Sequence, residues 1–186
     1  MTDYKKINLK VGLELHQQLA TKHKLFCNCS TEMKEKNPTH VVKRKLHPVA
    51  SELGDIDIAA QHEYLRNRTF HYQVFPRETC LVELDDEPPH ELNREALDAA
   101  IQVALMLNCE IPGELQVMRK TVIDGSNTGG FQRTVIVGLN GWIEYKGNKI
   151  EIAQVSLEED AAAIVTDANG EVTYRLNRLG IPLVEV

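Results

Sequence analysis

Residues 131–157 read FQRTVIVGLNGWIEYKGNKIEIAQVSL, and this stretch decides the fold class. β-branched and aromatic residues are frequent in it, as is typical of strands. Two turn signals, Asn140-Gly141 and Gly147-Asn148, interrupt it, and each favours a hairpin. The expected strands are therefore Phe131–Leu139, Gly141–Tyr145 and Lys149–Leu157. Because strands joined by short turns pair antiparallel, this stretch predicts the centre of an antiparallel sheet.

The flanking sequence extends the sheet and adds helices. Alternating patterns and turn residues predict strands at Lys10–Leu19, Thr69–Val74, Leu115–Ile123 and Glu171–Leu176. Helices are expected at Ser51–Arg68 and, more clearly, at Arg94–Leu107, where Asn93 can cap the first turn. The sequence therefore predicts an α+β fold, in which a mostly antiparallel β-sheet carries packed helices.

Composition limits the classes of protein and partner. The 186 residues are 42% hydrophobic and carry a net charge of −6, which argues against a domain that coats nucleic acid by its overall charge. No apolar run approaches the roughly 18 residues that predict a membrane span, and the N-terminus is polar rather than signal-like. We expect a cytoplasmic protein with reduced thiols and no membrane partner.

Glu14 and His16 are the first candidate site residues. They are two positions apart on a predicted strand, so their side chains leave the same face about 7 Å apart and can reach one ion. A carboxylate and an imidazole suit a divalent metal, although Mg²⁺ prefers oxygen ligands. The alternative is an ordinary polar face of a strand exposed to solvent.

Two further acidic residues stand in positions that suit a site. Glu158 follows the predicted strand Lys149–Leu157, and carboxylates at strand ends are common around nucleotide-bound Mg²⁺. Glu185 lies between Val184 and Val186 in the last apolar run. It is either the outward side chain of a strand or a metal ligand, and the residues alone leave both readings open.

A loop rich in glycine and hydroxyl groups precedes Glu158 in the sequence. Its basic and polar candidates for phosphate contacts are Arg119, Lys120, Ser126, Asn127, Thr128 and Arg133. The spacing matches neither the P-loop nor the dinucleotide-binding fingerprint. The residues by themselves therefore leave a plain hairpin loop as the alternative.

The four cysteines do not have the spacing of a zinc site. Cys27 and Cys29 are closer than the usual Cys-x-x-Cys half-site, while Cys80 and Cys109 stand alone in the sequence. The spacing therefore argues against zinc.

Several motifs in one order resemble the B/E family of tRNA-dependent amidotransferase subunits, and the archaeal E type more than the bacterial B type. The resemblance covers essentially the whole chain. Its motifs are VGLELHQQL at 11–19, KLFCNC at 24–29, LVELDDEPPH at 81–90, MRK at 118–120, DGSNT at 124–128, FQRT at 131–134, LEED at 157–160 and NRLGIPLVE at 177–185.

The resemblance implies a cradle-like, glutamine-synthetase-like kinase domain that uses ATP and Mg²⁺. In this family the γ-carboxylate of glutamate on Glu-tRNA(Gln) is phosphorylated, and ammonia from an asparaginase-like glutaminase partner, the D-type subunit, displaces the phosphate. The resemblance places four residues at the metal and the reaction, namely Glu14, His16, Glu158 and Glu185. It also implies that residues 1–186 are the N-terminal part of the cradle, without the helical and tail domains of the family.

Two other readings make different predictions. A non-catalytic RNA- or partner-binding module predicts that the four candidate metal ligands do not converge. A metal-dependent hydrolase predicts turnover without ATP. The resemblance also argues against a structural zinc. Some bacterial relatives follow the paired cysteines with a Cys-x-x-Cys, and this sequence lacks that second pair.

Overall fold

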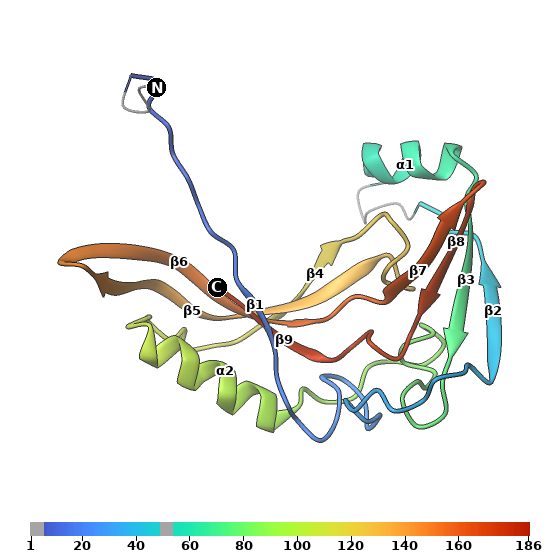
Figure 1. Ribbon diagram of the computed structural model, residues 1–186, viewed down its shortest axis with the longest axis horizontal. Coiled ribbons are helices and arrows are strands. Elements are labelled where there is room, and N and C mark those ends of the chain that lie inside the picture. The colour runs from blue at the N-terminus through green and yellow to red at the C-terminus, as the bar shows by residue number, and fades with distance from the viewer. Residues whose placement is uncertain (1–5, 49–53) are drawn as a thin grey trace.

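The computed structural model describes residues 6–48 and 54–186, and within them the chain forms two sheets and two helices (Figure 1). The five-stranded sheet runs in the order β1 (His16–Gln18), β9 (Pro182–Glu185), β6 (Asn148–Glu159), β5 (Phe131–Tyr145), β4 (Val117–Thr121). The four-stranded sheet runs β2 (His40–Arg44), β3 (Thr69–Val74), β8 (Glu171–Arg175), β7 (Ala163–Ala168). Only β3 and β8 pair in parallel among these strands. The predicted α+β fold with a mostly antiparallel sheet is confirmed.

Helix α2 (Arg94–Met106) covers one face of the β5–β6 hairpin (Figure 1). Asn93 caps it, because its Oδ1 accepts a hydrogen bond from the Ala96 N–H at 3.2 Å, as the sequence predicts. The apolar stripe of the helix packs against buried side chains of the hairpin, including Val135 and Leu157. The uncovered face of the same sheet carries the candidate site.

Three aromatic rings form the centre of the second sheet. Phe70 and Tyr72 on β3 and Tyr174 on β8 are buried and stacked, with ring centroids 6.1 to 6.4 Å apart. Parallel pairing places Tyr72 directly beside Tyr174. This sheet therefore has its own core, separate from the one under α2.

The predicted hairpin at Asn140-Gly141 is wrong, because β5 continues through it and turns only near Gly147. Gly141 has a packing role instead: a Cβ there would lie 2.4 Å from the Cys109 sulfur. Glycine permits this close approach between the strand and the segment that follows α2. An Asn-Gly pair can mark close backbone packing as well as a turn.

The predicted strand Lys10–Leu19 and helix Ser51–Arg68 are both shorter than expected. Only His16–Gln18 is assigned as strand, although Leu15 also exchanges two backbone hydrogen bonds with Val186. Residues 6–14 run away from the body (Figure 1). The helix is α1 (Ile58–Leu65), begun by the Asp57 cap, and residues 49–53 of the predicted range lie outside the described residues.

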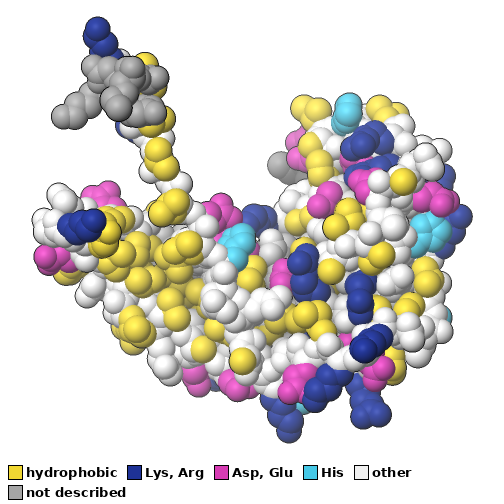
Figure 2. Space-filling view, viewed as in Figure 1, with side chains coloured by type: hydrophobic (Ala, Val, Ile, Leu, Met, Phe, Trp, Pro, Cys, Tyr) yellow, Lys and Arg dark blue, Asp and Glu magenta, His cyan; other side chains and the backbone are white. Residues whose placement is uncertain are grey.

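The molecule is hollowed between two arms. Figure 2 shows the depression between the β5–β6 hairpin on one side and α1 with the second sheet on the other. No helix in the described part of the chain is long and apolar enough to cross a membrane. The face of the five-stranded sheet that α2 leaves uncovered opens into this depression (Figure 1).

Candidate functional site

Strand pairing brings the candidate ligands onto one face of the five-stranded sheet. His16 is paired with Glu185, and Glu185 with Ser156, so these three side chains share a face. Glu158 is two residues beyond Ser156 on β6 and shares it as well. Residues from the two ends of the chain therefore meet on neighbouring strands.

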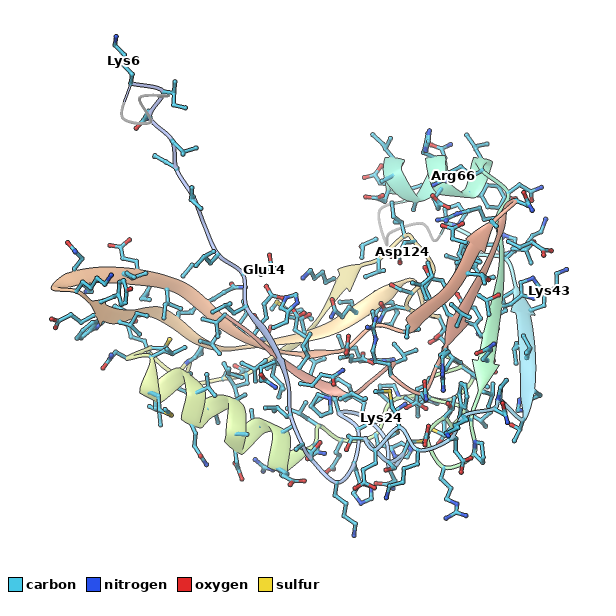
Figure 3. The ribbon with its side chains drawn as sticks, viewed as in Figure 1. Lys6, Glu14, Lys24, Lys43, Arg66 and Asp124 are labelled. Atoms are coloured by element: carbon cyan, nitrogen blue, oxygen red, sulfur yellow. The ribbon has the colours of Figure 1, made fainter. Side chains whose placement is uncertain are left out.

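Three of these groups are close enough to bind one ion. His16 Nε2 lies 3.0 Å from Glu14 Oε1 and 3.4 Å from Glu185 Oε2. One donor atom from each residue lies within 4.8 Å of the others. Glu14, labelled in Figure 3, and His16 are exposed, whereas the Glu185 side chain is only 16% exposed. The cluster is therefore open on one side only.

Glu158 adds a buried carboxylate to this cluster. Thr134 Oγ1 donates a hydrogen bond to Glu158 Oε1 at 3.0 Å. Burial, together with the nearby charge of Glu185, raises the pKa of Glu158 above its ordinary value. Lys120 Nζ lies 3.7 Å from both carboxylates. Glu158 thus lies beside the group of Glu14, His16 and Glu185, on the same face of the sheet.

The donor set of this cluster fits a divalent cation. Glu185 Oε2 is buried and accepts no hydrogen bond, so it has a lone pair directed at the cluster without a bonded donor. Three carboxylates and one imidazole can hold a hard divalent ion that keeps water on its open side. The residues present therefore fit Mg²⁺.

The predicted phosphate contacts divide between the two faces of the sheet. Lys120 is paired with Gln132, two residues from Thr134, and so shares the face of Glu158. Arg119 is paired with Arg133, and both point to the opposite face. The sequence could not separate them, because the direction of each side chain depends on the register of β4.

The two arginines have different surroundings. Arg133 Nη1 binds both oxygens of buried Glu159, at 2.9 and 3.3 Å. Arg119 stacks over the Phe131 ring at 5.3 Å, and within the described residues no carboxylate forms an ion pair with it. Of the two, only Arg119 has a guanidinium without an anionic partner in the described part of the chain.

Arg119 also lines a cavity of about 690 Å³ between β4, α1 and the 128–131 loop. Other cationic or glycine residues around it are Arg44, Lys45, Arg68, Gly129 and Gly130. Arg44 and Arg68 are already paired with Asp86 and Glu63. A bound anion in this cavity would therefore find Arg119 and the loop backbone available.

The Ser126–Asn127–Thr128 segment lies in the hairpin loop between β4 and β5 and is held by hydrogen bonds. Ser126 donates to Asp124 Oδ1 through both its N–H and its hydroxyl, at 2.9 and 2.6 Å. Thr128 Oγ1 donates to the Glu83 carbonyl at 2.7 Å. Asn127 is buried. Such a loop is pre-organised, as a phosphate-binding loop must be.

Sequence reasoning missed Tyr72 and Tyr174, whose hydroxyl groups hold the 124–128 loop through its backbone carbonyls. Tyr72 donates to the Gly125 carbonyl at 2.8 Å, and Tyr174 donates to the Asp124 carbonyl at 3.0 Å. Gly125 has φ +87°, and a Cβ there would meet the Phe70 ring at 2.3 Å. Only the alternation of aromatic residues on two distant strands could have hinted at this support.

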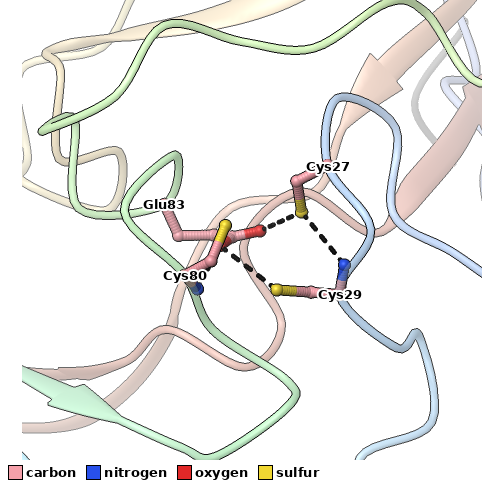
Figure 4. A group of neighbouring side chains, drawn as sticks. All are labelled: Cys27, Cys29, Cys80 and Glu83. Carbon is pink, nitrogen blue, oxygen red and sulfur yellow. Dashed lines mark hydrogen bonds between the residues drawn. The ribbon is translucent and has the colours of Figure 1, made fainter.

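Figure 4 shows a second group of potential metal ligands, Cys27, Cys29, Cys80 and Glu83, of which all but the half-buried Cys80 are buried. Cys27 Sγ donates to Glu83 Oε1 at 2.8 Å, Cys29 Sγ lies 3.8 Å from Glu83 Oε2, and the Cys80 N–H donates to Glu83 Oε2 at 2.7 Å. One donor atom from each of the four residues lies within 4.8 Å of the others. The description of Cys80 as isolated is therefore wrong: the loop after β3 returns it to the Cys27 loop.

The ionisable groups of this second cluster shift one another's pKa. Hydrogen bonds to Cys29 and Cys80 raise the pKa of Cys27, whereas the thiols of Cys27 and Cys29 lower the pKa of Cys80. Burial raises the pKa of Glu83, and Lys24, whose Nζ is 3.3 Å from Glu83 Oε1, opposes that rise. Three sulfurs and one carboxylate suit tetrahedral Zn²⁺, and Lys24 already supplies one positive charge there.

Comparison with known proteins gives a consistent result. The family model described as GatB/GatE catalytic domain matches residues 9–186. The chain is 54% identical over 184 residues to the E subunit of glutamyl-tRNA(Gln) amidotransferase from Sulfurisphaera tokodaii, which is 99% of this chain and 29% of that protein. It is 52% identical over 184 residues to the protein of the same name from Methanothermobacter thermautotrophicus, again 99% of this chain, and 30% of that protein.

The E subunit from Archaeoglobus fulgidus is also similar, with 54% identity over 187 residues, 100% of this chain and 30% of that protein. The chain thus spans about 30% of the length of these curated relatives. The similarity includes both clusters, because it runs through the whole chain.

Proposed function

Because the chain belongs to the GatB/GatE catalytic domain family, we propose that it forms the phosphoryl-transfer part of a glutamyl-tRNA(Gln) amidotransferase. The single observation that carries the proposal is the convergence of Glu14, His16, Glu158 and Glu185 in the hollow of the molecule. An open cluster of carboxylates that fits a divalent ion is what an ATP-dependent step requires.

The proposed reaction converts Glu-tRNA(Gln) to Gln-tRNA(Gln) in two transfers. First, a γ-carboxylate oxygen of the glutamyl group attacks the terminal phosphorus of ATP, and the bond from that phosphorus to the ADP oxygen breaks. Ammonia then attacks the acyl carbon, phosphate leaves with its electron pair, and nitrogen loses a proton to give the amide. No side-chain nucleophile is needed, because the carboxylate of the substrate attacks.

Glu14, His16, Glu158 and Glu185 would hold Mg²⁺ at the edge of the hollow. The chemistry that the ion supplies when bound is neutralisation of charge on the phosphates. Glu158 and Glu185 position the site because strands β6 and β9 fix their backbones. Glu14 and His16 would hold the ion from the exposed side of the cluster.

The basic residues have separate tasks in this proposal. Lys120 lies between Glu158 and Glu185 and neutralises them before metal and nucleotide enter. Arg119 and the loop residues Ser126, Asn127 and Thr128 would contact phosphates from the other side of β4. Arg133 would support the site by holding Glu159 rather than by contacting the nucleotide.

The remaining parts of the proposal concern partners. Ammonia would come from an asparaginase-like glutaminase, the D-type subunit, and the acceptor would be Glu-tRNA(Gln). Since the net charge is −6, tRNA contacts made by this part of the protein would be local. Most of the tRNA-binding surface would then belong to the further length found in the relatives.

Calorimetric titration with Mg²⁺ and ATP tests this proposal. We expect saturable binding, weakened about tenfold or more in Glu158→Gln and Glu185→Gln, because each loses a charged ligand. Glu151→Gln, an exposed acid on β6, is the matched control and should bind like wild type. Unchanged binding in both site variants would contradict the proposal, and phosphate release from a simple ester without ATP would favour the hydrolase.

A further inference from the structure

Gln18 lies beside the carboxylate cluster but is not one of the four proposed ligands. It is two residues beyond His16 on β1, and its pairing with Leu183 places it on the same face as Glu158, the partner of Leu183 on β6. Along the strand, Gln18 and His16 are about 7 Å apart. Its side chain is exposed to the hollow rather than packed.

A second side chain fixes the orientation of the Gln18 amide. Gln18 Nε2 donates to Asp160 Oδ2 at 2.5 Å. Asp160 is itself held by Arg178, whose Nε is 3.7 Å from Oδ1 and donates to the Ala161 carbonyl at 2.6 Å. Because Nε2 is the donor in this bond, the amide oxygen Oε1 is the free acceptor, and no donor in the described residues is bonded to it.

Gln18 Oε1 and the Asp160 carboxylate are therefore two acceptors with one negative charge, and Gln18 lies on the sheet face that carries Glu158. This is the arrangement that binds a primary ammonium group. A glutamyl group in extended form places its ammonium nitrogen about 5 Å from its γ-carboxylate carbon, from standard bond lengths. That separation is of the same order as the distance of about 7 Å between Gln18 and His16 along the strand.

We propose that Gln18 Oε1 and the Asp160 carboxylate bind the α-ammonium group of the glutamyl ester, and that Gln18 is a specificity-determining residue for the acyl end of the substrate. The inference rests on the proposed function, since it places the γ-carboxylate of the same group at the metal ligands. A neutral amide suits this position because it accepts from the ammonium without adding another carboxylate that would compete for metal.

The neighbouring residue provides a matched control. Gln17 has the same side chain, but alternation directs it to the other face of β1. Its Nε2 donates to the Gln18 backbone carbonyl at 2.9 Å, so it does not reach Asp160. Gln17→Met and Gln18→Met are therefore equal changes in composition on opposite faces of one strand.

In the test, two small ligands are titrated separately into the 186-residue chain, and NMR measures their binding. L-glutamate α-methyl ester carries the α-ammonium and the γ-carboxylate, whereas monomethyl glutarate has the same chain and lacks the ammonium. Each titration is run with Mg²⁺ alone and with Mg²⁺ and a non-hydrolysable ATP analogue. MgATP binding and thermal unfolding are measured for every variant.

We expect wild type and Gln17→Met to bind the amino ester about tenfold more tightly than the glutarate, as a charge-assisted hydrogen bond would give. Gln18→Met should reduce this ratio to about one, while the affinity for monomethyl glutarate, the affinity for MgATP and the unfolding temperature stay unchanged. A merely structural role for Gln18 would instead lower the affinity for both probes together.

Equal binding of the two probes by wild type would overturn the inference, as would a tenfold ratio that persists in Gln18→Met. Absence of binding of the ester by a chain that binds MgATP would also overturn it and would leave the proposed function standing. Failure to bind MgATP is the separate result that counts against the proposed function.

Discussion

The chain contains two four-residue groups of metal-binding side chains, and they differ in position, donor atoms and charge balance. The carboxylate cluster of Glu14, His16, Glu158 and Glu185 opens into the hollow. The thiol cluster of Cys27, Cys29, Cys80 and Glu83 lies among buried residues, with Lys24 beside it. Exposure separates the two, because Glu14 and His16 are exposed, whereas Cys27, Cys29 and Glu83 are buried and Cys80 is half-buried.

The two clusters also differ in how their charge is balanced. The carboxylate cluster concentrates negative charge that only an entering cation or Lys120 offsets. In the thiol cluster the Lys24 side chain is 0% exposed, and its Nζ lies 3.3 Å from Glu83 Oε1. Ligand binding should therefore affect the carboxylate cluster more strongly. Substitutions should change the stability of the chain more strongly at the thiol cluster.

The largest expected effect is on the thiol cluster. Lys24→Met leaves Glu83 buried without its cationic partner and also removes the bond to the Glu78 carbonyl. We expect a loss of about 3 to 5 kcal/mol in the free energy of unfolding, measured with denaturant. Lys22→Met, at an exposed lysine, is the control and should change stability little. A loss in Lys24→Met below about 1 kcal/mol would mean that Glu83 is neutral in the folded chain.

The second prediction separates the clusters by metal preference. If three sulfurs and Glu83 act together, the chain binds one Zn²⁺ in competition with a chromophoric chelator, and Cys80→Ser weakens this binding by about 100-fold or more. Cys109→Ser, at the cysteine packed under α2, should leave it unchanged. If the wild-type chain takes up no Zn²⁺, the Lys24 ammonium is the cation of this cluster.

A third, smaller effect is expected in the loop between β4 and β5, which contacts the thiol cluster through the Glu83 carbonyl. Thr128 in this loop binds the Glu83 carbonyl, and Tyr72 supports Gly125 from the other side. Tyr72→Phe removes one buried hydroxyl and should cost about 1 kcal/mol in unfolding free energy. Tyr145→Phe, at an exposed hairpin position, should be neutral. An equal loss of unfolding free energy in the two variants would show that the hydrogen bond of the buried hydroxyl does not cause it.

The smallest effect concerns pH in the carboxylate cluster. The pKa of Glu158 is raised by burial and by Glu185, so the folded chain holds this proton more tightly than the unfolded chain. The stability contributed by that proton is complete below the ordinary glutamate pKa and is lost as pH rises through the raised value. Glu158→Gln should therefore be slightly more stable than wild type at about pH 7 without metal.

At a pH below the ordinary glutamate pKa, this advantage of Glu158→Gln should vanish, and excess Mg²⁺ at about pH 7 should reverse it, because only the carboxylate binds the ion. Thermal unfolding over this pH range measures both. A variant that is less stable than wild type at every pH would show that the hydrogen bond from Thr134, rather than the charge, decides.

The sequence predicts the parts of the fold and site that depend on local order. Asn93 is recognisable as a helix cap and Thr69–Val74 as a strand, because capping and alternation are properties of adjacent residues. The shared face of Glu14 and His16 follows from their spacing alone. The Asn140-Gly141 turn fails for the opposite reason, since packing against Cys109 overrides the local preference.

The sequence by itself thus determined the α+β class, the two-residue spacing of Glu14 and His16 and the motifs that carry the candidate ligands, since each depends on order along a short segment of chain. Tertiary structure alone decided that Cys80 joins Cys27, that Arg133 binds Glu159 while Lys120 faces the carboxylates, and that Glu185 pairs with His16. The physical reason is that strand register sets side-chain direction between distant segments, and one residue of register moves every side chain to the other face.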